Sequence, residues 1–123
     1  MISRTLSSLP LLVVFLAELA LSQTAEEKAL YPDWSKVMKE QGYMWEPHTV
    51  VTEDGWYLTL FRITGRNGKL TTPDPLKYPI LVQHGAFDDG LKMVDRGLKR
   101  WPTLPLQLAN RGYDVWIGNN RGT

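Results

Sequence analysis

The chain has 123 residues, enough for one domain of ordinary composition, with 43% hydrophobic and 22% charged residues. Its formal net charge of +1 gives no strong field that would favour nucleic acid or an anionic membrane as a partner. Because there is no cysteine, disulfides, thiol catalysis and thiolate metal sites are excluded. The two histidines, His48 and His84, lie far apart without acidic neighbours at metal-ligand spacing, so we expect neither a metal ion nor another cofactor.

The first 22 residues have the pattern of a secretory signal peptide. Arg4 provides a positive n-region, residues 9–17 form an apolar run, and the Ala-Leu-Ser sequence at 20–22 suits a cleavage site. An uncleaved membrane anchor is the alternative, but a spanning helix needs about 20 mostly apolar residues. We therefore expect residues 1–22 to be removed in the secretory pathway and residues 23–123 to form the mature part.

Residues 33–42 predict a short amphipathic helix. Asp33 is a suitable N-cap residue, and Gly42 is a suitable stop. Four side chains recur at helical spacing on one face: Trp34, Val37, Met38 and Gln41. We expect this face to pack against the core.

A β-hairpin is predicted after the helix. Two β-rich runs, residues 48–52 and 56–63, are separated by Glu53-Asp54-Gly55, and Asp-Gly favours a tight turn because glycine accepts a positive φ. Large apolar groups alternate onto both faces of the second run, so both faces are expected to be covered. Residues 65–78, rich in glycine and proline, are expected to be a loop.

The second half of the chain predicts a βαβ unit. Residues 79–83 form an apolar strand of the buried parallel type that ends in a His-Gly pair. A helix begins near Thr103 and ends at Gly112, and residues 113–117 form the next strand. Strands joined through a helix pair in parallel, so we expect an α/β fold in which an antiparallel hairpin leads into a parallel βαβ sheet.

Two loops follow the carboxyl ends of these strands, where parallel sheets place their functional groups: residues 84–90 and 118–123. In the first loop, His84-Gly85-Ala86 has the position in which α/β-hydrolases build part of an oxyanion hole. The backbone N–H of Ala86 is the expected donor, because a fixed N–H stabilises the negative charge that develops on an ester carbonyl oxygen during attack. The alternative is that the His-Gly pair is an ordinary strand-ending turn.

Three segments carry specific motifs in a fixed order. They read GYMWEPHTVVTEDGWYLTLFRI (residues 42–63), PILVQHGAFDDG (residues 79–90) and LPLQLANRGYDVWIGNNRGT (residues 104–123). Together they resemble the partial α/β-hydrolase lipase region of the acid lipases, the family of gastric lipase and lysosomal acid lipase. The resemblance covers about residues 31–123 and implies the N-terminal portion of an α/β-hydrolase fold.

The resemblance also implies roles for individual residues. Ala86, where the family usually has leucine, contributes the oxyanion N–H, and His84 and Gly85 support the hole. The turn that matches the family after the last strand is read as structural support and consists of Gly118, Asn119, Arg121 and Gly122. The implied enzyme is secreted or lysosomal, hydrolyses carboxylic esters of acylglycerols or steryl esters in lipid catabolism, and meets its neutral lipid substrate at an interface.

The sequence holds no nucleophile suited to this reaction. There is no G-x-S-x-G motif, and the only serine after the signal segment is Ser35, on the predicted first helix rather than at a strand-to-helix turn. No later acid or histidine is available to complete a triad in the order Ser, Asp, His. We therefore expect an N-terminal fragment of an enzyme, in which the strand at 113–117 has an exposed apolar edge.

Two other functions stay open from the sequence. One is a non-catalytic lipid-binding module that uses exposed aromatic side chains, for which the candidates are Trp45, Trp56, Phe87 and Trp101. The other is a different α/β-hydrolase such as an epoxide hydrolase. That family prefers His-Gly-x-Pro at the strand end, and the fourth residue here is Phe87.

Overall fold

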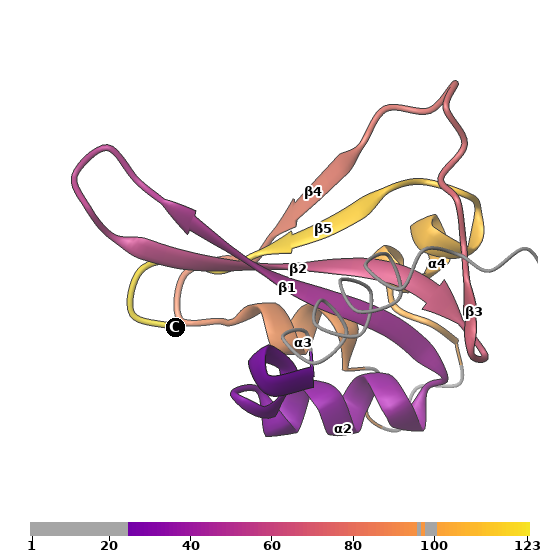
Figure 1. Ribbon diagram of the computed structural model, residues 1–123, viewed down its shortest axis with the longest axis horizontal. Helices are drawn as coiled ribbons and strands as arrows, with labels where there is room; N and C mark the ends of the chain where they lie inside the picture. The colour runs from indigo at the N-terminus through magenta and orange to yellow at the C-terminus, as the bar shows by residue number, and fades with distance from the viewer. Residues whose placement is uncertain (1–24, 96, 98–100) are drawn as a thin grey trace, which may run out of the picture.

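The computed structural model describes residues 25–95, 97 and 101–123, so the predicted signal peptide lies outside the described residues. The helices and strands follow in the order α2 (Pro32–Glu40), β1 (Tyr43–Val51), β2 (Tyr57–Arg66), β3 (Lys69–Leu70), β4 (Ile80–Gln83), α3 (Gly90–Val94), α4 (Leu104–Asn110) and β5 (Val115–Gly118). Figure 1 shows α2 and α3 together on one face of the sheet. Four strands lie side by side in the order β1-β2-β5-β4, and β3 pairs with β2.

The sheet is mixed, as the sequence predicts. β1 pairs antiparallel with β2, β2 pairs antiparallel with β5, and β5 pairs parallel with β4. The chain passes from β4 to β5 through α3 and α4, which makes the predicted βαβ unit. The α/β architecture, with an antiparallel hairpin leading into a parallel pair, is therefore confirmed.

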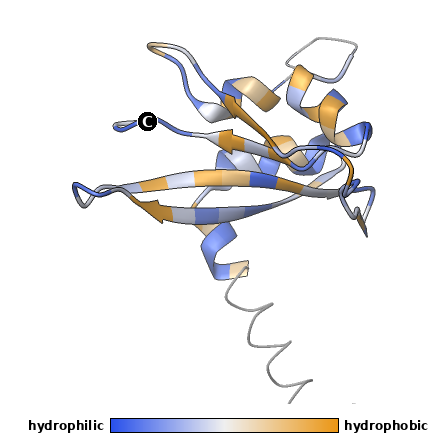
Figure 2. Cartoon of the chain, turned by 90° about the horizontal axis from the view of Figure 1, so that it is seen from above, coloured by the Kyte–Doolittle hydropathy of each residue, from blue (hydrophilic) through white to orange (hydrophobic). Residues whose placement is uncertain are grey.

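The core lies between one face of the sheet and the helices. Its buried members are Tyr43, Trp45, Phe61, Ile63, Val115 and Ile117 from the strands, with Trp34, Met38, Val94 and Leu106 from the helices and their ends. The strand residues alternate, as expected for strands with one covered face. Figure 2 shows the hydrophobic residues concentrated in the strands and helices, whereas the connecting turns are mostly hydrophilic.

Helix α2 packs by the predicted face, with Trp34 and Met38 buried. It begins at Pro32, and its N-cap is Tyr31, which makes no side-chain capping bond. The prediction of Asp33 as the N-cap is wrong: proline has a preset φ that suits the first helical position, so the N-cap lies two residues earlier, at Tyr31. Asp33 then lies in the first turn, where its charge complements the helix dipole.

The β1–β2 hairpin turns at the predicted place. Gly55 has a φ of +85°, and the Thr52 N–H donates to the Trp56 carbonyl oxygen at 2.9 Å. Phe61 is buried, but Tyr57 near the tip is 74% exposed. The predicted cover on both faces is therefore wrong at the tip, because the tip extends beyond the helices that cover the rest of the hairpin (Figure 1).

The predicted loop at 65–78 contains a short strand, β3. Asn67 and Gly68 have φ values of 50° and 73°, and they turn β2 back onto β3. Two consecutive positive φ values are the requirement of a type I′ hairpin turn, for which Asn-Gly is a preferred pair. The prediction of a loop is wrong for residues 69 and 70, and the Asn-Gly pair is the signal that identifies the turn.

The edges of the sheet also differ from the prediction. β5, expected at an exposed edge, lies between β2 and β4. β4, expected to be a buried strand, has an unpaired edge among the described residues, and its Leu81 is 59% exposed. The reason is the long-range pairing of β5 with β2, for example Phe61 with Ile117, which no local pattern encodes.

Candidate functional site

The loops after β4 and β5 meet. They line a pocket of about 500 Å³ formed by His84, Gly85, Ala86, Phe87, Asp88, Asp89, Asn120, Arg121, Gly122 and Thr123. The two loops adjoin because the carboxyl ends of adjacent parallel strands lie at the same end of a sheet. Of the predicted site residues, Gly118 and Asn119 lie outside this lining, at the end of β5.

His84 is the buried polar residue at the end of β4, with 5% of its surface exposed. Its Nε2 accepts the Asn120 N–H at 3.1 Å. Its Nδ1 lies 2.9 Å from the Gly85 carbonyl oxygen. His84 therefore joins the two site loops, and both ring nitrogens are occupied by backbone groups.

Ala86 is exposed in the pocket, and its N–H makes no hydrogen bond with any other described residue. The next residue, Phe87, has a φ of 63° with its side chain fully exposed. A positive φ is costly for a bulky residue and marks a turn that the surrounding structure enforces. The turn thus leaves a backbone donor free at the strand end.

The Asn119 side chain forms two hydrogen bonds that connect the end of β5 with other elements. Its side-chain oxygen accepts the Gly90 N–H at 3.0 Å, and its amide nitrogen donates to the Thr59 carbonyl oxygen at 3.0 Å. A Cβ on Gly90 would lie 2.8 Å from the Asn119 oxygen, so the start of α3 approaches β5 this closely only because residue 90 is glycine. Asn119 therefore links the end of β5 with β2 and the start of α3.

Gln83 and Asn120 form a contact that the sequence prediction missed. The Gln83 amide nitrogen donates to the Asn120 side-chain oxygen at 2.9 Å. A Cβ at Gly118 would collide with the Gln83 side chain, so glycine at this position leaves room for that bond. The missed signal is the polar Gln83 at the end of an otherwise apolar strand.

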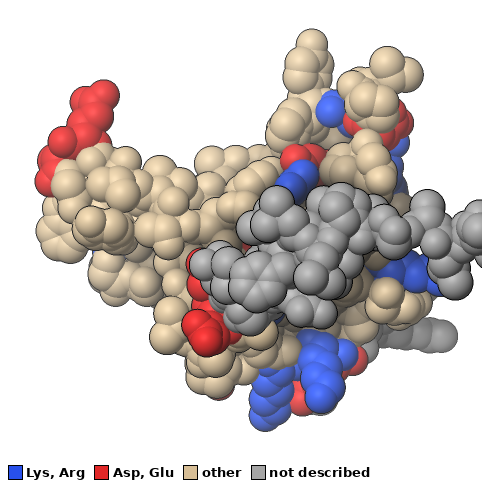
Figure 3. Space-filling view, in the orientation of Figure 1, with Lys and Arg blue, Asp and Glu red and all other residues tan. Residues whose placement is uncertain are grey.

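Arg121 lies in the turn after β5, here called the site turn, and contacts the tip of the β1–β2 hairpin. Its guanidinium donates to Asp54 at 2.7 Å and lies 5.4 Å from the centre of the Trp56 ring. Figure 3 shows the acidic hairpin tip as a projecting red patch at the left of the molecule. Asp54 and Trp56 become site neighbours only through the fold, since 67 positions separate Asp54 from Arg121.

The Asp54–Arg121 pair is expected to persist in acid. The pKa of Asp54 lies below its ordinary value of 3.8, first because the Thr52 hydroxyl donates to the carboxylate and also because Arg121 does. A lowered folded pKa means that the contribution of the pair is complete above pH 3.8 and is lost as the pH falls through the lower folded value. The indole N–H resonance of Trp56 should therefore titrate with a midpoint below 3.8.

The matched control is Asp54→Asn, which keeps the size of the side chain and removes its titration. The Trp56 resonance of this variant should show no such step. A midpoint at or above 3.8 in the unsubstituted chain would contradict the pairing.

Two carboxylates of the pocket lining, Asp88 and Asp89, come directly before α3. The Lys92 ammonium lies 3.1 Å from Asp88, and this bond is the main reason that the pKa of Asp88 is lowered. Asp89 is the N-cap of α3, and its side chain accepts the Lys92 N–H. These carboxylates thus have structural partners on α3.

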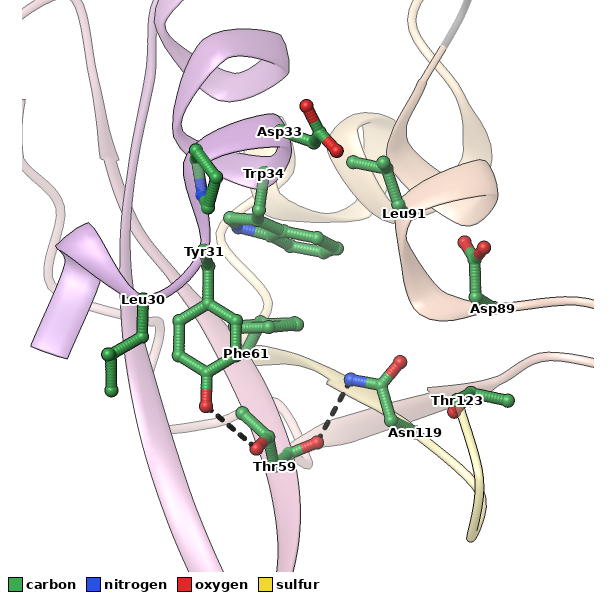
Figure 4. A pocket seen from close by; sticks show the side chains of 11 residues that line it. Leu30, Tyr31, Asp33, Trp34, Thr59, Phe61, Asp89, Leu91, Asn119 and Thr123 are labelled. Carbon is green, nitrogen blue, oxygen red and sulfur yellow. Dashed lines mark hydrogen bonds between the residues drawn. The ribbon is translucent and has the colours of Figure 1, made fainter.

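A second cavity of about 300 Å³ adjoins the site (Figure 4). Trp34, Phe61 and Tyr31 form much of its wall, and the Tyr31 hydroxyl lies 2.9 Å from the Thr59 hydroxyl. Asn119, which follows β5, lines this cavity and points toward Thr59, as the close-up shows. The cavity is therefore a continuation of the core beside the site rather than a separate centre.

Other chemical groups in the described part of the chain do not add a catalytic centre. Ser35 lies on α2, and its hydroxyl donates to the Lys28 carbonyl oxygen at 3.3 Å. The described residues contain no group of three or more His, Cys, Asp and Glu side chains arranged to hold a metal ion. In the same residues, no helix has the length and apolar character needed to span a membrane.

The four aromatic residues proposed for lipid contact separate into two sets. Trp45 is buried, so its assignment to a lipid-contact surface is wrong: it packs edge-on against Trp34 and Phe61 in the core. Trp56, Phe87 and Trp101 are exposed. The sequence could not separate the sets, because whether an aromatic side chain is covered depends on elements that are distant in the chain, as α2 covers Trp45 of β1.

Residues 34–94 match the family model of the partial alpha/beta-hydrolase lipase region. The chain belongs to this lipase family. The matched span includes most of α2, the β1–β2 hairpin, and the strand end at His84, Gly85 and Ala86. The resemblance that the sequence motifs carry is therefore confirmed.

Curated relatives of this α/β-hydrolase lipase chain are named as lipases. Triacylglycerol lipase 2 of Arabidopsis thaliana is 43% identical over 67% of this chain and 19% of its own length. Tear acid lipase-like protein of Mesocricetus auratus is 35% identical over 84% of this chain and 25% of its own length. Putative lysosomal acid lipase/cholesteryl ester hydrolase of Crotalus adamanteus is 38% identical over 72% and 21%. The chain thus spans about a fifth to a quarter of these relatives.

Proposed function

We propose that the chain is the N-terminal portion of a secreted or lysosomal lipase that hydrolyses carboxylic esters of acylglycerols or steryl esters. The observation that supports this most directly is the free N–H of Ala86 at the end of β4, beside the buried His84. The names of the relatives agree with a lipid ester as substrate. The proposed signal peptide at residues 1–22 agrees with the secretory pathway.

The contribution of this chain to the reaction is electrostatic. Attack on an ester carbonyl places negative charge on its oxygen, and a preorganised N–H stabilises that charge without further rearrangement. Ala86 supplies one such donor, and the nucleophile and its base lie outside these 123 residues. A lone donor is not a hydrolase, so the activity requires the remainder of the enzyme.

The proposal is tested on the protein encoded by the transcript that contains this sequence. It is expressed in secretory cells, incubated with triolein and with cholesteryl oleate, and treated with a fluorophosphonate probe for reactive serines. We expect release of fatty acid and covalent labelling of one serine. A transcript without G-x-S-x-G in the roughly 60 residues after Thr123, or a secreted protein that resists labelling, would overturn the proposal.

A second candidate, non-catalytic lipid binding, draws support from exposed aromatics around the pocket. Phe87 lines the pocket, and Trp56 contacts Arg121 of the same lining. The measurement is co-flotation of the 123-residue chain with triolein emulsion, compared with the Phe87→Ser variant. Binding that depends on Phe87, in a protein that the serine probe does not label, would favour this candidate over the lipase.

A further inference from the structure

The hydrogen-bond partners of His84 determine which of its ring nitrogens carries the proton. The Asn120 backbone N–H can only donate, so Nε2 of His84 accepts and is unprotonated. The Gly85 carbonyl oxygen can only accept, so Nδ1 carries the proton and donates. Both bonds are satisfied together in one form of the side chain, the neutral Nδ1–H tautomer.

The Gly85 carbonyl and the Ala86 N–H belong to the same peptide group. A peptide group is planar, and in the trans form its C=O and N–H point in opposite directions. A hydrogen bond that holds the Gly85 oxygen therefore also sets the direction of the Ala86 N–H. His84 holds that oxygen at 2.9 Å from a buried ring.

We infer that His84 is a positioning residue, which aims the Ala86 N–H through the Gly85–Ala86 peptide plane. The inference rests on the proposed function, in which this N–H stabilises an oxyanion. The Asn120 N–H favours the Nδ1–H tautomer of His84, which this positioning requires. The Gln83 amide nitrogen in turn donates to the Asn120 side-chain oxygen at 2.9 Å. The turn after β5 thus helps to set the direction of the Ala86 N–H at the end of β4.

The second histidine provides a control inside the same chain. His48 Nε2 lies 2.9 Å from the Glu46 carboxylate, which can only accept. Its neutral form should therefore be the Nε2–H tautomer, opposite to His84. Two histidines of one molecule are expected to give opposite patterns in one spectrum.

The tautomers are measured on the full chain by long-range ¹H–¹⁵N correlation of ¹⁵N-histidine, at a pH of about 8.5 where exposed histidines are neutral. His84 should show a protonated Nδ1 and a bare Nε2, and His48 the reverse. A protonated Nε2 on His84 would overturn the inference. This measurement needs no catalysis, so its failure is distinct from failure of the lipase proposal.

The direction of the Ala86 N–H is measured by residual dipolar couplings in two variants. His84→Leu removes both ring bonds, and His84→Asn keeps a donor near the position of Nδ1. The Ala86 coupling should change in the leucine variant and remain near the wild-type value in the asparagine variant, while the couplings of Val115 and Ile117 stay constant. An unchanged Ala86 coupling in His84→Leu would contradict the inference. If that variant does not fold, the inference is tested by the tautomer of His84 in the unsubstituted chain.

In the lipase that contains this chain, the variants His84→Leu and His84→Asn distinguish a positioning role of His84 from a purely structural role. His84→Leu should lower kcat by about tenfold or more with little change in KM, since loss of a whole oxyanion donor costs about 10²–10³-fold. His84→Asn should recover most of that loss. Equal kcat values for the two variants would contradict a role through the Gly85 carbonyl.

Discussion

Replacing Ala86 with proline is expected to lower kcat for ester hydrolysis by about 10²–10³-fold in the proposed lipase that contains this chain. Proline has no backbone N–H, so the developing oxyanion loses a donor. The effect should fall on kcat rather than on KM, because the interaction strengthens only as charge develops in the transition state. No folded-state hydrogen bond is lost with it, since the Ala86 N–H has no partner among the described residues.

The matched control is Ala86→Gly, which removes a methyl group and keeps the N–H. Its kcat should stay within a few-fold of the unsubstituted enzyme, by comparison with the much larger cost of a lost donor. Circular dichroism of both variants checks that they fold alike. A proline variant as active as the glycine variant would remove Ala86 from the reaction.

Replacing Trp34 with alanine is expected to destabilise the fold by about 3–5 kcal/mol, the usual cost of deleting a buried aromatic side chain. Trp34 is 3% exposed and stacks on Phe61, with ring centroids 4.0 Å apart. Its indole N–H has no acceptor among the described residues, so its removal also relieves an unsatisfied donor. We therefore expect the loss to fall near the lower end of the range.

Trp56→Ala is the matched control for this prediction. It deletes the same side chain at a position that is 53% exposed, where the ring lies 5.4 Å from the Arg121 guanidinium carbon. The expected cost is about 1 kcal/mol or less, the scale of an exposed cation–π contact. Urea unfolding of both variants, followed by circular dichroism, measures the difference, and equal costs would contradict the position of Trp34 in the core.

Local patterns in the sequence were enough to place most of the elements. Helical spacing identified the buried face of α2, and glycines at 55 and 112, both with φ near +85°, marked the hairpin turn and the end of α4. Each of these signals lies within a few residues of the element that it defines. The motif order then predicted the lipase family, which is confirmed, and the assignment of the site to the His84-Gly85-Ala86 strand end stays a prediction.

The sequence by itself determined the α/β elements, the parallel βαβ unit and the two loops that line the candidate site. Only the tertiary structure decided the strand order, which moved the open edge from β5 to β4, and the contacts that hold the site: His84 with Asn120, and Arg121 with Asp54. The physical reason is the range of each interaction. Turn geometry and helical spacing are encoded over a few neighbouring residues, whereas a sheet brings together groups 36 to 67 positions apart once their faces are buried jointly.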